Sequence, residues 1–469
     1  MGKCIDFKPQ TRWARVFALA VVFGTGMAHY SPAIAQSVTP KQTAVPNTGD
    51  RDLASINARR NVLFQRMVEQ PDDLDIAFEY AALSVRVGDL EAAIGTLERM
   101  LIFAPGLPRL QLELGLLYYR VGAFETARTY LEAGIAAPNV PPNVLARVEQ
   151  ILAGIDTAEK RQKLSGQFRV GLRYQSNANR APRSADVDLN GLIFQLSQDA
   201  LGESDLNVYG AASVHFVHEL ESQGDTFEVD VIGYGAKQFQ RHELDLLQGE
   251  ITAGPAFDMG RFDIDNAKLG VYGIASAVHL AGDFYASAFG VGSRLAMKPS
   301  AQASLLLKAE YRRRIFQDTT NAPTGSNRTG DEYRLGAFGS YIVNPNLMIS
   351  GGIQHQWSTA ELDFLAYSET TVFAGPTYAF ASPIDESAKA WTASLHLGAT
   401  LRRYDAPDPV INAAEEQNDN EFFVRTSLTI PIHDEWALLG EAEYRNINSN
   451  YDTRKHDNAT VTLSAVKKF

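Results

Sequence analysis

The sequence predicts α + β structure in separate domains: an N-terminal α-solenoid of the tetratricopeptide (TPR) kind, followed by a 14-stranded transmembrane antiparallel β-barrel. The segment 51–163 shows helical periodicity and contains an internal repeat. From residue 167 onward, apolar and polar residues alternate with the period of two that is typical of strands. The chain ends on such an alternating segment, with Phe469 last, as the strand pair that closes a barrel requires.

The first 35 residues have the pattern of a secretory signal peptide. Four basic residues lie between Lys3 and Arg15, and an apolar stretch too short to span a bilayer covers residues 16–28. An A-x-A cleavage site ends at Ala35. A short membrane anchor is the alternative interpretation. Residues 36–50 follow as a polar linker without apolar periodicity.

The composition excludes some classes of partner and indicates the compartment of the protein. The chain has 43 basic and 55 acidic residues, a net charge of −12, which argues against nucleic acid as a partner. The single cysteine, Cys4, lies in the expected signal peptide, so we expect the exported protein to fold without disulfides. We find no later stretch of apolar residues long enough to span a bilayer and therefore expect no transmembrane helix.

The helical region contains a repeat. The residue pairs Pro71/Pro105, Gly88/Gly122 and Ala93/Ala127 are separated by the same offset. This offset matches the TPR period, a helix–turn–helix unit of about 34 residues, although a plain helical bundle is the alternative. The second unit carries Gly115 and Tyr118 at positions that Ala81 and Ser84 occupy in the first. Two repeats cannot close a solenoid alone, so the flanking helices, near 52–69 and 142–163, are expected to cap it.

A binding groove is predicted on the first helix of each repeat, because these helices line the concave face of a TPR array. The predicted client-binding residues are Phe78, Arg86, Leu112, Tyr119 and Arg120. A curved surface of apolar residues and arginines can clamp an extended peptide. The alternative is that these side chains pack against the barrel rim or a cap helix.

Connection lengths predict the strand number. Counting back from Phe469, the tight connections are 433–435, 381–387, 344–346, 298–300, 259–266 and 219–225, and between them lie 448–457, 405–419, 359–366, 317–330, 280–282 and 240–243. In outer-membrane barrels the short turns face the periplasm and the long loops face outward. The first strand is then 167–174 and the second starts near Leu206. With 14 strands, the chain enters the barrel and leaves it on the periplasmic side. A fifteenth strand would put the helices outside the cell, so we assign 175–204 to a surface loop or a lumen-entering segment.

Charged residues alternate onto the inward face of the strands. The predicted lumen residues are Lys308, Glu310, Arg312, Arg314, His396, Arg402, Arg425, Glu441, Glu443 and Arg445. Charges of both signs on neighbouring strands can pair across the wall and only stabilise the barrel. The functional alternative is a polar conduit that keeps a passing chain from adhering.

Catalysis finds little support. We see no G-x-S-x-G, H-E-x-x-H or P-loop motif, and the nine histidines do not cluster at metal-ligand spacing. We therefore expect no enzymatic activity, no catalytic residue, no metal site and no cofactor.

The start of the barrel carries a motif. Val170-Gly-Leu-Arg-Tyr-Gln-Ser-Asn-Ala-Asn-Arg-Ala-Pro182 contains a G-x-x-Y-x-S-N-x-N-x-A-P run. With a signal peptide, a short TPR module and a C-terminal barrel, the chain resembles the surface lipoprotein assembly modifier (Slam) family, the outer-membrane component of type XI secretion. The resemblance covers nearly all of the mature chain. The degenerate first TPR unit departs from the pattern.

The resemblance implies export of a protein client, a surface lipoprotein or small secreted protein, across the outer membrane of a Gram-negative bacterium. It places the helical domain (51–163) in the periplasm and the barrel (164–469) in outer-membrane lipid, inserted with help from the barrel assembly machinery. It supplies no site residues. A polysaccharide exporter with a TPR scaffold and a passive porin are the alternatives.

Overall fold

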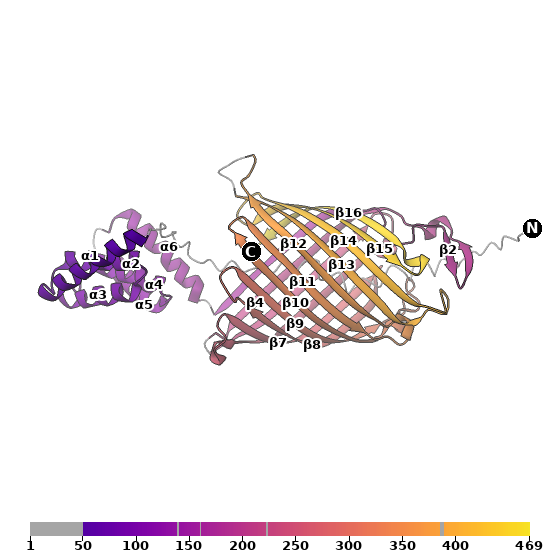
Figure 1. The fold of residues 1–469 in the computed structure, drawn as a ribbon, viewed down its shortest axis with the longest axis horizontal. Helices are drawn as coiled ribbons and strands as arrows, with labels where there is room; N and C mark the ends of the chain where they lie inside the picture. Colours follow the sequence, from indigo (N-terminus) through magenta and orange to yellow (C-terminus); the bar gives the residue numbers. More distant parts are fainter. Residues whose placement is uncertain (1–49, 138–139, 160, 222–223, 385–388) are drawn as a thin grey trace, which may run out of the picture. The chain divides into compact units, whose positions relative to one another are not determined.

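The computed structural model describes residues 50–137, 140–159, 161–221, 224–384 and 389–469. They form a helical unit, whose described part ends at Glu159, and a barrel unit, which starts at Arg161 (Figure 1). The predicted signal peptide and, apart from Asp50, the predicted linker lie outside the described residues. Within the described ranges, no helix has the length and apolar character needed to cross a membrane.

The helical unit contains two equivalent helix pairs. The helices are α1 Asp50–Glu69, α2 Leu74–Arg86, α3 Leu90–Phe103, α4 Pro108–Arg120, α5 Phe124–Ile135 and α6 Pro142–Glu159. The pair α4–α5 repeats the pair α2–α3 with the offset seen in the sequence at both helix starts, which confirms the TPR-like prediction. Gly88 (φ 84°) and Gly122 (φ 80°) turn the chain between the helices of each pair, in a backbone region that favours glycine. Ala93 and Ala127 are fully buried where the helices pack.

The positions where the first repeat departs from the TPR pattern have a structural use. Ser84 is fully buried and accepts a hydrogen bond of 3.1 Å from Nε of Arg60 in α1. In the second repeat, the equivalent Tyr118 instead stacks on Tyr130 of α5 with ring centroids 5.7 Å apart. The small Ser84 thus leaves room for an arginine from the preceding helix.

Both flanking helices contribute to the helical core, as expected of caps. Met67 of α1 is buried in the cluster that joins α2, α3 and α4. Val148 and Ile155 of α6 are buried with Ala127 and Leu131 of α5. Each end of the two-repeat array is therefore covered by an additional helix.

The barrel unit is a closed sheet of 14 antiparallel strands, which confirms the predicted fold class (Figure 1). The strands are β1 Gln162–Gln175, β4 Asp205–Glu219, β5 Thr226–Gln238, β6 Leu246–Asp258, β7 Ala267–Leu280, β8 Asp283–Met297, β9 Ala303–Phe316, β10 Gly330–Asn344, β11 Leu347–Ser358, β12 Tyr367–Phe380, β13 Trp391–Pro407, β14 Glu416–Pro431, β15 Trp436–Ser449 and β16 His456–Lys468. Each strand pairs with its neighbour along the chain, and β1 closes the barrel by pairing with both β4 and β16. A separate hairpin, β2 Asp186–Leu189 and β3 Leu192–Gln195, lies between β1 and β4 in the chain.

The two faces of the barrel differ in chemistry. On β9, Leu307 and Tyr311 are exposed, whereas Arg312 and Arg314 beyond them are 4% and 6% exposed. Every barrel strand carries at least one exposed large apolar side chain. An apolar outer face around a polar interior is the pattern of an outer-membrane barrel.

The barrel begins earlier than the sequence pattern indicated. The strand β1 starts at Gln162 rather than at residue 167, and α6 ends at Glu159 rather than at 163. The additional residues lack apolar alternation, and they are held by backbone pairing with β4, from Gln162 opposite His218 to Gly166 opposite Val214. Pairing between backbones leaves little trace in residue type, so the boundary could not be located from the sequence.

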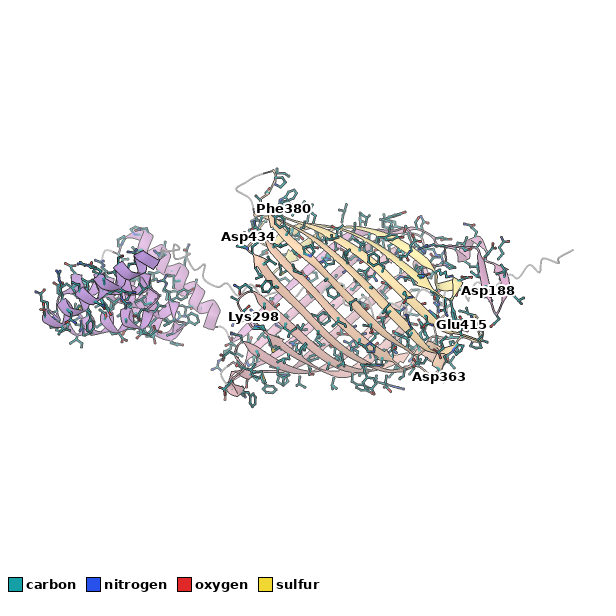
Figure 2. All side chains as sticks on the ribbon, in the orientation of Figure 1. Asp188, Lys298, Asp363, Phe380, Glu415 and Asp434 are labelled. Carbon is teal, nitrogen blue, oxygen red and sulfur yellow. The ribbon has the colours of Figure 1, made fainter. Side chains whose placement is uncertain are left out.

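Most short connections lie at one end of the barrel and most long ones at the other, but the turn 281–282 lies among the long connections and 381–390 among the short ones. In Figure 2, Lys298, Phe380 and Asp434 mark the end with the short turns. Asp188, Asp363 and Glu415 mark the other end in the same view. The predicted connections fall between the observed strands, but their lengths do not alternate strictly, and residues 385–388 of one connection lie outside the described part of the chain.

The barrel closes at Phe469. Its N–H donates to the carbonyl oxygen of Gly166 (3.1 Å), and the Gly166 N–H donates to the Phe469 carbonyl oxygen (2.9 Å). A Cβ atom at Gly166 would lie 2.5 Å from the carbonyl oxygen of Ser213 and 2.6 Å from the Phe469 ring. The backbone of β4 on one side and the Phe469 ring at the seam therefore leave no room for a side chain at this position.

We predict that Gly166→Ala lowers the fraction of folded barrel after membrane insertion, because an added Cβ must displace the Ser213 carbonyl of β4 and the Phe469 ring. Deletion of Phe469 should have the same effect, because it removes both of its hydrogen bonds to Gly166. Heat-modifiable migration on gels measures that fraction. Gly233→Ala is the matched control, since a Cβ there meets nothing within 4 Å. Equal folded fractions for the two variants would contradict the role of the seam.

Candidate functional site

The interior wall of β12–β15 carries a connected set of ion pairs. Glu443 accepts from Arg425 Nε (2.7 Å) and from Arg445 Nε (2.5 Å). Arg445 also pairs with Glu421 of β14, so one strand pair holds four alternating charges. Each of these four side chains is 11–26% exposed, so each charge has its counter-charge where water is limited.

A second carboxylate pair holds Arg402 of β13. Its Nε donates to Glu369 of β12 at 2.7 Å, and its Nη1 lies 3.9 Å from Asp419 of β14. The guanidinium carbon also lies 5.3 Å from the centroid of the Tyr367 ring. Strands on both sides of β13 therefore position this cation.

On the β5–β9 side, long cations reach across intervening strands. Arg294 of β8 donates from Nη1 to Asp230 of β5 (2.8 Å) and also pairs with Glu228. Arg312 of β9 pairs with Glu250 of β6. The path of Arg294 passes over Gly270 of β7, where an added Cβ would lie 3.1 Å from the arginine Cγ. Small residues on the crossed strands thus make room for long side chains inside the barrel.

The remaining predicted lumen residues also have interior contacts. Lys308 Nζ lies 3.1 Å from Glu310, and Arg314 lies 3.5 Å from the fully buried Glu332. His396 lies 3.0 Å from the Ser350 hydroxyl, and Glu441 lies 3.2 Å from Arg169 of β1. The structure therefore places all ten predicted lumen side chains on the inward face. Their role in transport stays a prediction.

The counter-charges of these residues escaped the sequence analysis. They are Arg169, Glu250, Arg294, Glu332, Arg334, Glu369, Asp419 and Glu421. The signal that could have found them is the same period-two alternation on their own strands. Within the described residues, no group of three or more His, Cys, Asp and Glu side chains is arranged to hold a metal ion.

The five predicted groove residues separate into two groups. Leu112 and Tyr119 pack onto the buried cluster that α5 and α6 share, and Phe78 packs on the α2–α4 cluster with the Arg109 guanidinium 4.4 Å above its ring. Arg86 and Arg120 are exposed, and each is the last residue of its helix. The two arginines are therefore repeat-equivalent surface cations, whereas the three apolar residues contribute largely to packing.

Two titrating groups link the helices. The Arg60 guanidinium donates to Asp89 and, with the Ala92 N–H, lowers the pKa of this α3 N-cap. Burial and a hydrogen bond to Glu98 raise the pKa of Tyr118 to about 12. Both shifts move the pKa away from neutral pH, so Asp89 stays ionised there and Tyr118 stays protonated.

The asparagines of the motif after β1 build a compact turn. Asn177 donates from Nδ2 to the Ala181 carbonyl (2.9 Å) and accepts from the Ala181 N–H (3.1 Å). Asn179 donates to the Leu201 carbonyl (2.8 Å) and accepts from the Glu203 N–H (2.9 Å). Both asparagines are buried. These amides are needed because each satisfies one backbone donor and one backbone acceptor in a segment without regular structure.

A family model named surface lipoprotein assembly modifier matches residues 166–469, which is most of the chain and nearly all of the barrel unit. The chain belongs to the surface lipoprotein assembly modifier family. This confirms the resemblance that was based on the architecture and on the motif at the start of the barrel. Family membership and the closed barrel support an outer-membrane location and a translocator function for this protein.

The solved structures that are similar to parts of this chain have low sequence identity to it. The Yersinia enterocolitica type III secretion chaperone SycD, with a peptide of the translocator YopD, is 15% identical (TM-score 0.22), covering 23% of this chain and 84% of SycD. The outer membrane channel DcaP of Acinetobacter baumannii is 10% identical (TM-score 0.35), covering 66% and 97%. A bacterial polysaccharide outer membrane secretin is 8% identical (TM-score 0.35), covering 65% and 98%. No curated protein matches the chain.

We predict that Glu443→Gln destabilises the barrel by on the order of 3 kcal/mol, because two guanidinium groups lose their shared counter-charge inside the wall. The midpoint of urea unfolding in detergent measures this change. Glu435→Gln is the control. Glu435 lies in a short turn, is 57% exposed, and has its Lys467 partner at 3.9 Å, so we expect a loss below about 1 kcal/mol. Similar midpoints for both variants would argue against a structural role of the interior pairs.

Proposed function

We propose that this protein exports a protein client, a surface lipoprotein, through or along its barrel, and that the helical unit engages the client in the periplasm. The observation that carries the proposal is the family match across the closed barrel. The polar interior supports a passage for a hydrophilic chain. We propose no catalytic step, because export of a folded or unfolded chain needs none in the barrel itself.

The topology of the barrel supports a periplasmic position for the helical unit. An even number of strands brings the start of β1 and the end of β16 to the same end of the barrel, where the short turns also lie. Outer-membrane barrels direct their short turns to the periplasm. The helical unit precedes β1 in the chain, and this supports a periplasmic position for it.

The helical unit offers a contact for a client. Arg86 and Arg120 occupy the same position in consecutive repeats, and both are exposed. Equally spaced cations on a repeat array suit an extended segment that carries acidic side chains or backbone carbonyls at matching intervals. Client capture by these arginines is therefore part of the proposal.

We predict that cells producing the Arg86→Glu, Arg120→Glu double variant fail to display the client, while the barrel remains heat-modifiable. Clients are first identified as lipoproteins that become accessible to external protease only when the parent protein is produced. Surface proteolysis with mass spectrometry then compares the variants.

Arg66→Glu with Arg147→Glu is the matched control, since it makes the same charge change at exposed positions of α1 and α6. Client display that persists in the Arg86, Arg120 double variant would refute the contribution of these arginines. If the parent protein changed surface polysaccharide and left surface lipoproteins unchanged, the polysaccharide-exporter alternative would replace the proposal.

A further inference from the structure

The segment between β1 and β4, residues 176–204, is here called the strap. Its two ends meet where Gln175 pairs with Asp205, and it contains the β2–β3 hairpin. Figure 1 shows β2 at the end of the barrel opposite to the C-terminus, among the long connections. Sequence analysis predicted either a surface loop or a segment that enters the lumen, and the strap has parts of both kinds.

The root of the strap turns inward. Beyond the buried Asn177 and Asn179, the backbone at Arg180 is left-handed, with φ 50°. The Arg180 guanidinium interacts electrostatically with Arg445 of β15, Glu421 of β14 and Arg402 of β13. It also interacts electrostatically with Tyr234 of β5, a strand on the other side of β1. Since these strands belong to different parts of the wall, the guanidinium extends into the lumen.

The tip of the strap is fastened to the rim through Asn190. The Asn190 N–H donates to the Ile411 carbonyl oxygen (2.8 Å), and its Nδ2 donates to the Pro409 carbonyl oxygen (3.1 Å). Its Oδ1 accepts from the Ala413 N–H (2.7 Å). The side-chain amide of Asn190 therefore bonds the connection between β13 and β14 through both its donor and its acceptor.

A second attachment joins the strap to β16 and to the connection that precedes it, and it includes an ion pair between Arg183 and Asp457 of β16. The Asp188 N–H donates to Asp452 (3.1 Å), and the Arg183 N–H donates to the Lys455 carbonyl oxygen (3.2 Å). Figure 2 shows Asp188 and Glu415 at the same end of the barrel. The strap thus starts between β1 and β4 and reaches connections that belong to β13–β16, on the other side of the seam.

We propose that the strap closes the outer mouth of the lumen and that Asn190 is the latch whose release opens it. The attachments of Asn190 are hydrogen bonds between neutral groups, which exchange with water more readily than ion pairs do. A strap with a fixed root and a releasable tip can move aside as a unit. The inference deepens the proposed function and rests on it, because a client that uses the lumen needs a mouth that opens.

The test uses Asn190→Gly in the purified full-length mature protein. Asn190 has φ 55°, which glycine adopts without strain, so this change removes the latch amide and preserves the backbone. Asn266→Gly is the matched control, with the same φ of 55° in a short turn at the opposite end of the barrel. We expect a several-fold higher mean conductance in planar bilayers for Asn190→Gly and parent conductance for Asn266→Gly. Equal conductance of the two variants would overturn the proposal.

A reversible lock gives an independent measurement. The bond between the Asn190 N–H and the Ile411 carbonyl brings these two backbones close enough for a disulfide in the Asn190→Cys, Ile411→Cys variant. The only native cysteine, Cys4, lies in the predicted signal peptide and would not compete. We expect low conductance in the oxidised protein and a several-fold rise on reduction, since the reduced variant lacks the latch amide. Equal conductance of the oxidised and the reduced protein would overturn the proposal that Asn190 is the latch.

The conductance measurements contain no client, so they test the strap separately from the proposed function. Client display in cells that produce the oxidised Asn190→Cys, Ile411→Cys variant tests whether the client passes through the lumen. Loss of display supports both proposals. Reversible conductance with unchanged display would support the strap and direct the client to a path along the outside of the barrel.

Discussion

Closure of the sheet is the constraint on which the structure depends. In lipid, an open strand edge would leave backbone N–H and C=O groups without partners, at a cost of several kcal/mol for each group. The pairing of β1 with β16, completed by the mutual hydrogen bonds of Gly166 and Phe469, removes that edge. The same closure fixes the relation between strand number and chain ends. An even number of strands returns the C-terminus to the end at which β1 began.

Closure also creates the chemistry of the interior. Side chains that alternate inward have no lipid to face and little water, so ionised groups must find counter-charges. Neighbouring strands supply them where long residues stand opposite each other, as with Arg425 and Glu443. Where the crossed strands carry glycine or another small residue, an arginine reaches a carboxylate several strands away, as Arg294 does over Gly270. Paired charges leave an interior that is polar, with these ionised groups compensated by neighbours.

The sequence predicted what depends on periodicity. Alternation identified the inward face of β9 and β13, and the TPR period identified equivalent helices in the two repeats. It could not predict contacts that arise from closure in three dimensions, such as Arg294 with Glu228, because those residues lie far apart in the chain on non-adjacent strands. Nor could it show that Leu112 and Tyr119 face the α5–α6 cluster, because a TPR groove and a capped TPR core have the same helical pattern.

Asparagine side chains satisfy backbone hydrogen-bonding groups in the strap, as strand pairing does in the barrel wall. Residues 176–204 have few ladder hydrogen bonds, so their backbone groups must be satisfied locally. An amide side chain supplies both donors and an acceptor, which suits it to tie irregular backbone at Asn177, Asn179 and Asn190. The two asparagines at the root are buried, whereas Asn190 is exposed at the rim. Water competes for hydrogen bonds only at the exposed site, so the same chemistry yields a permanent root and a releasable tip.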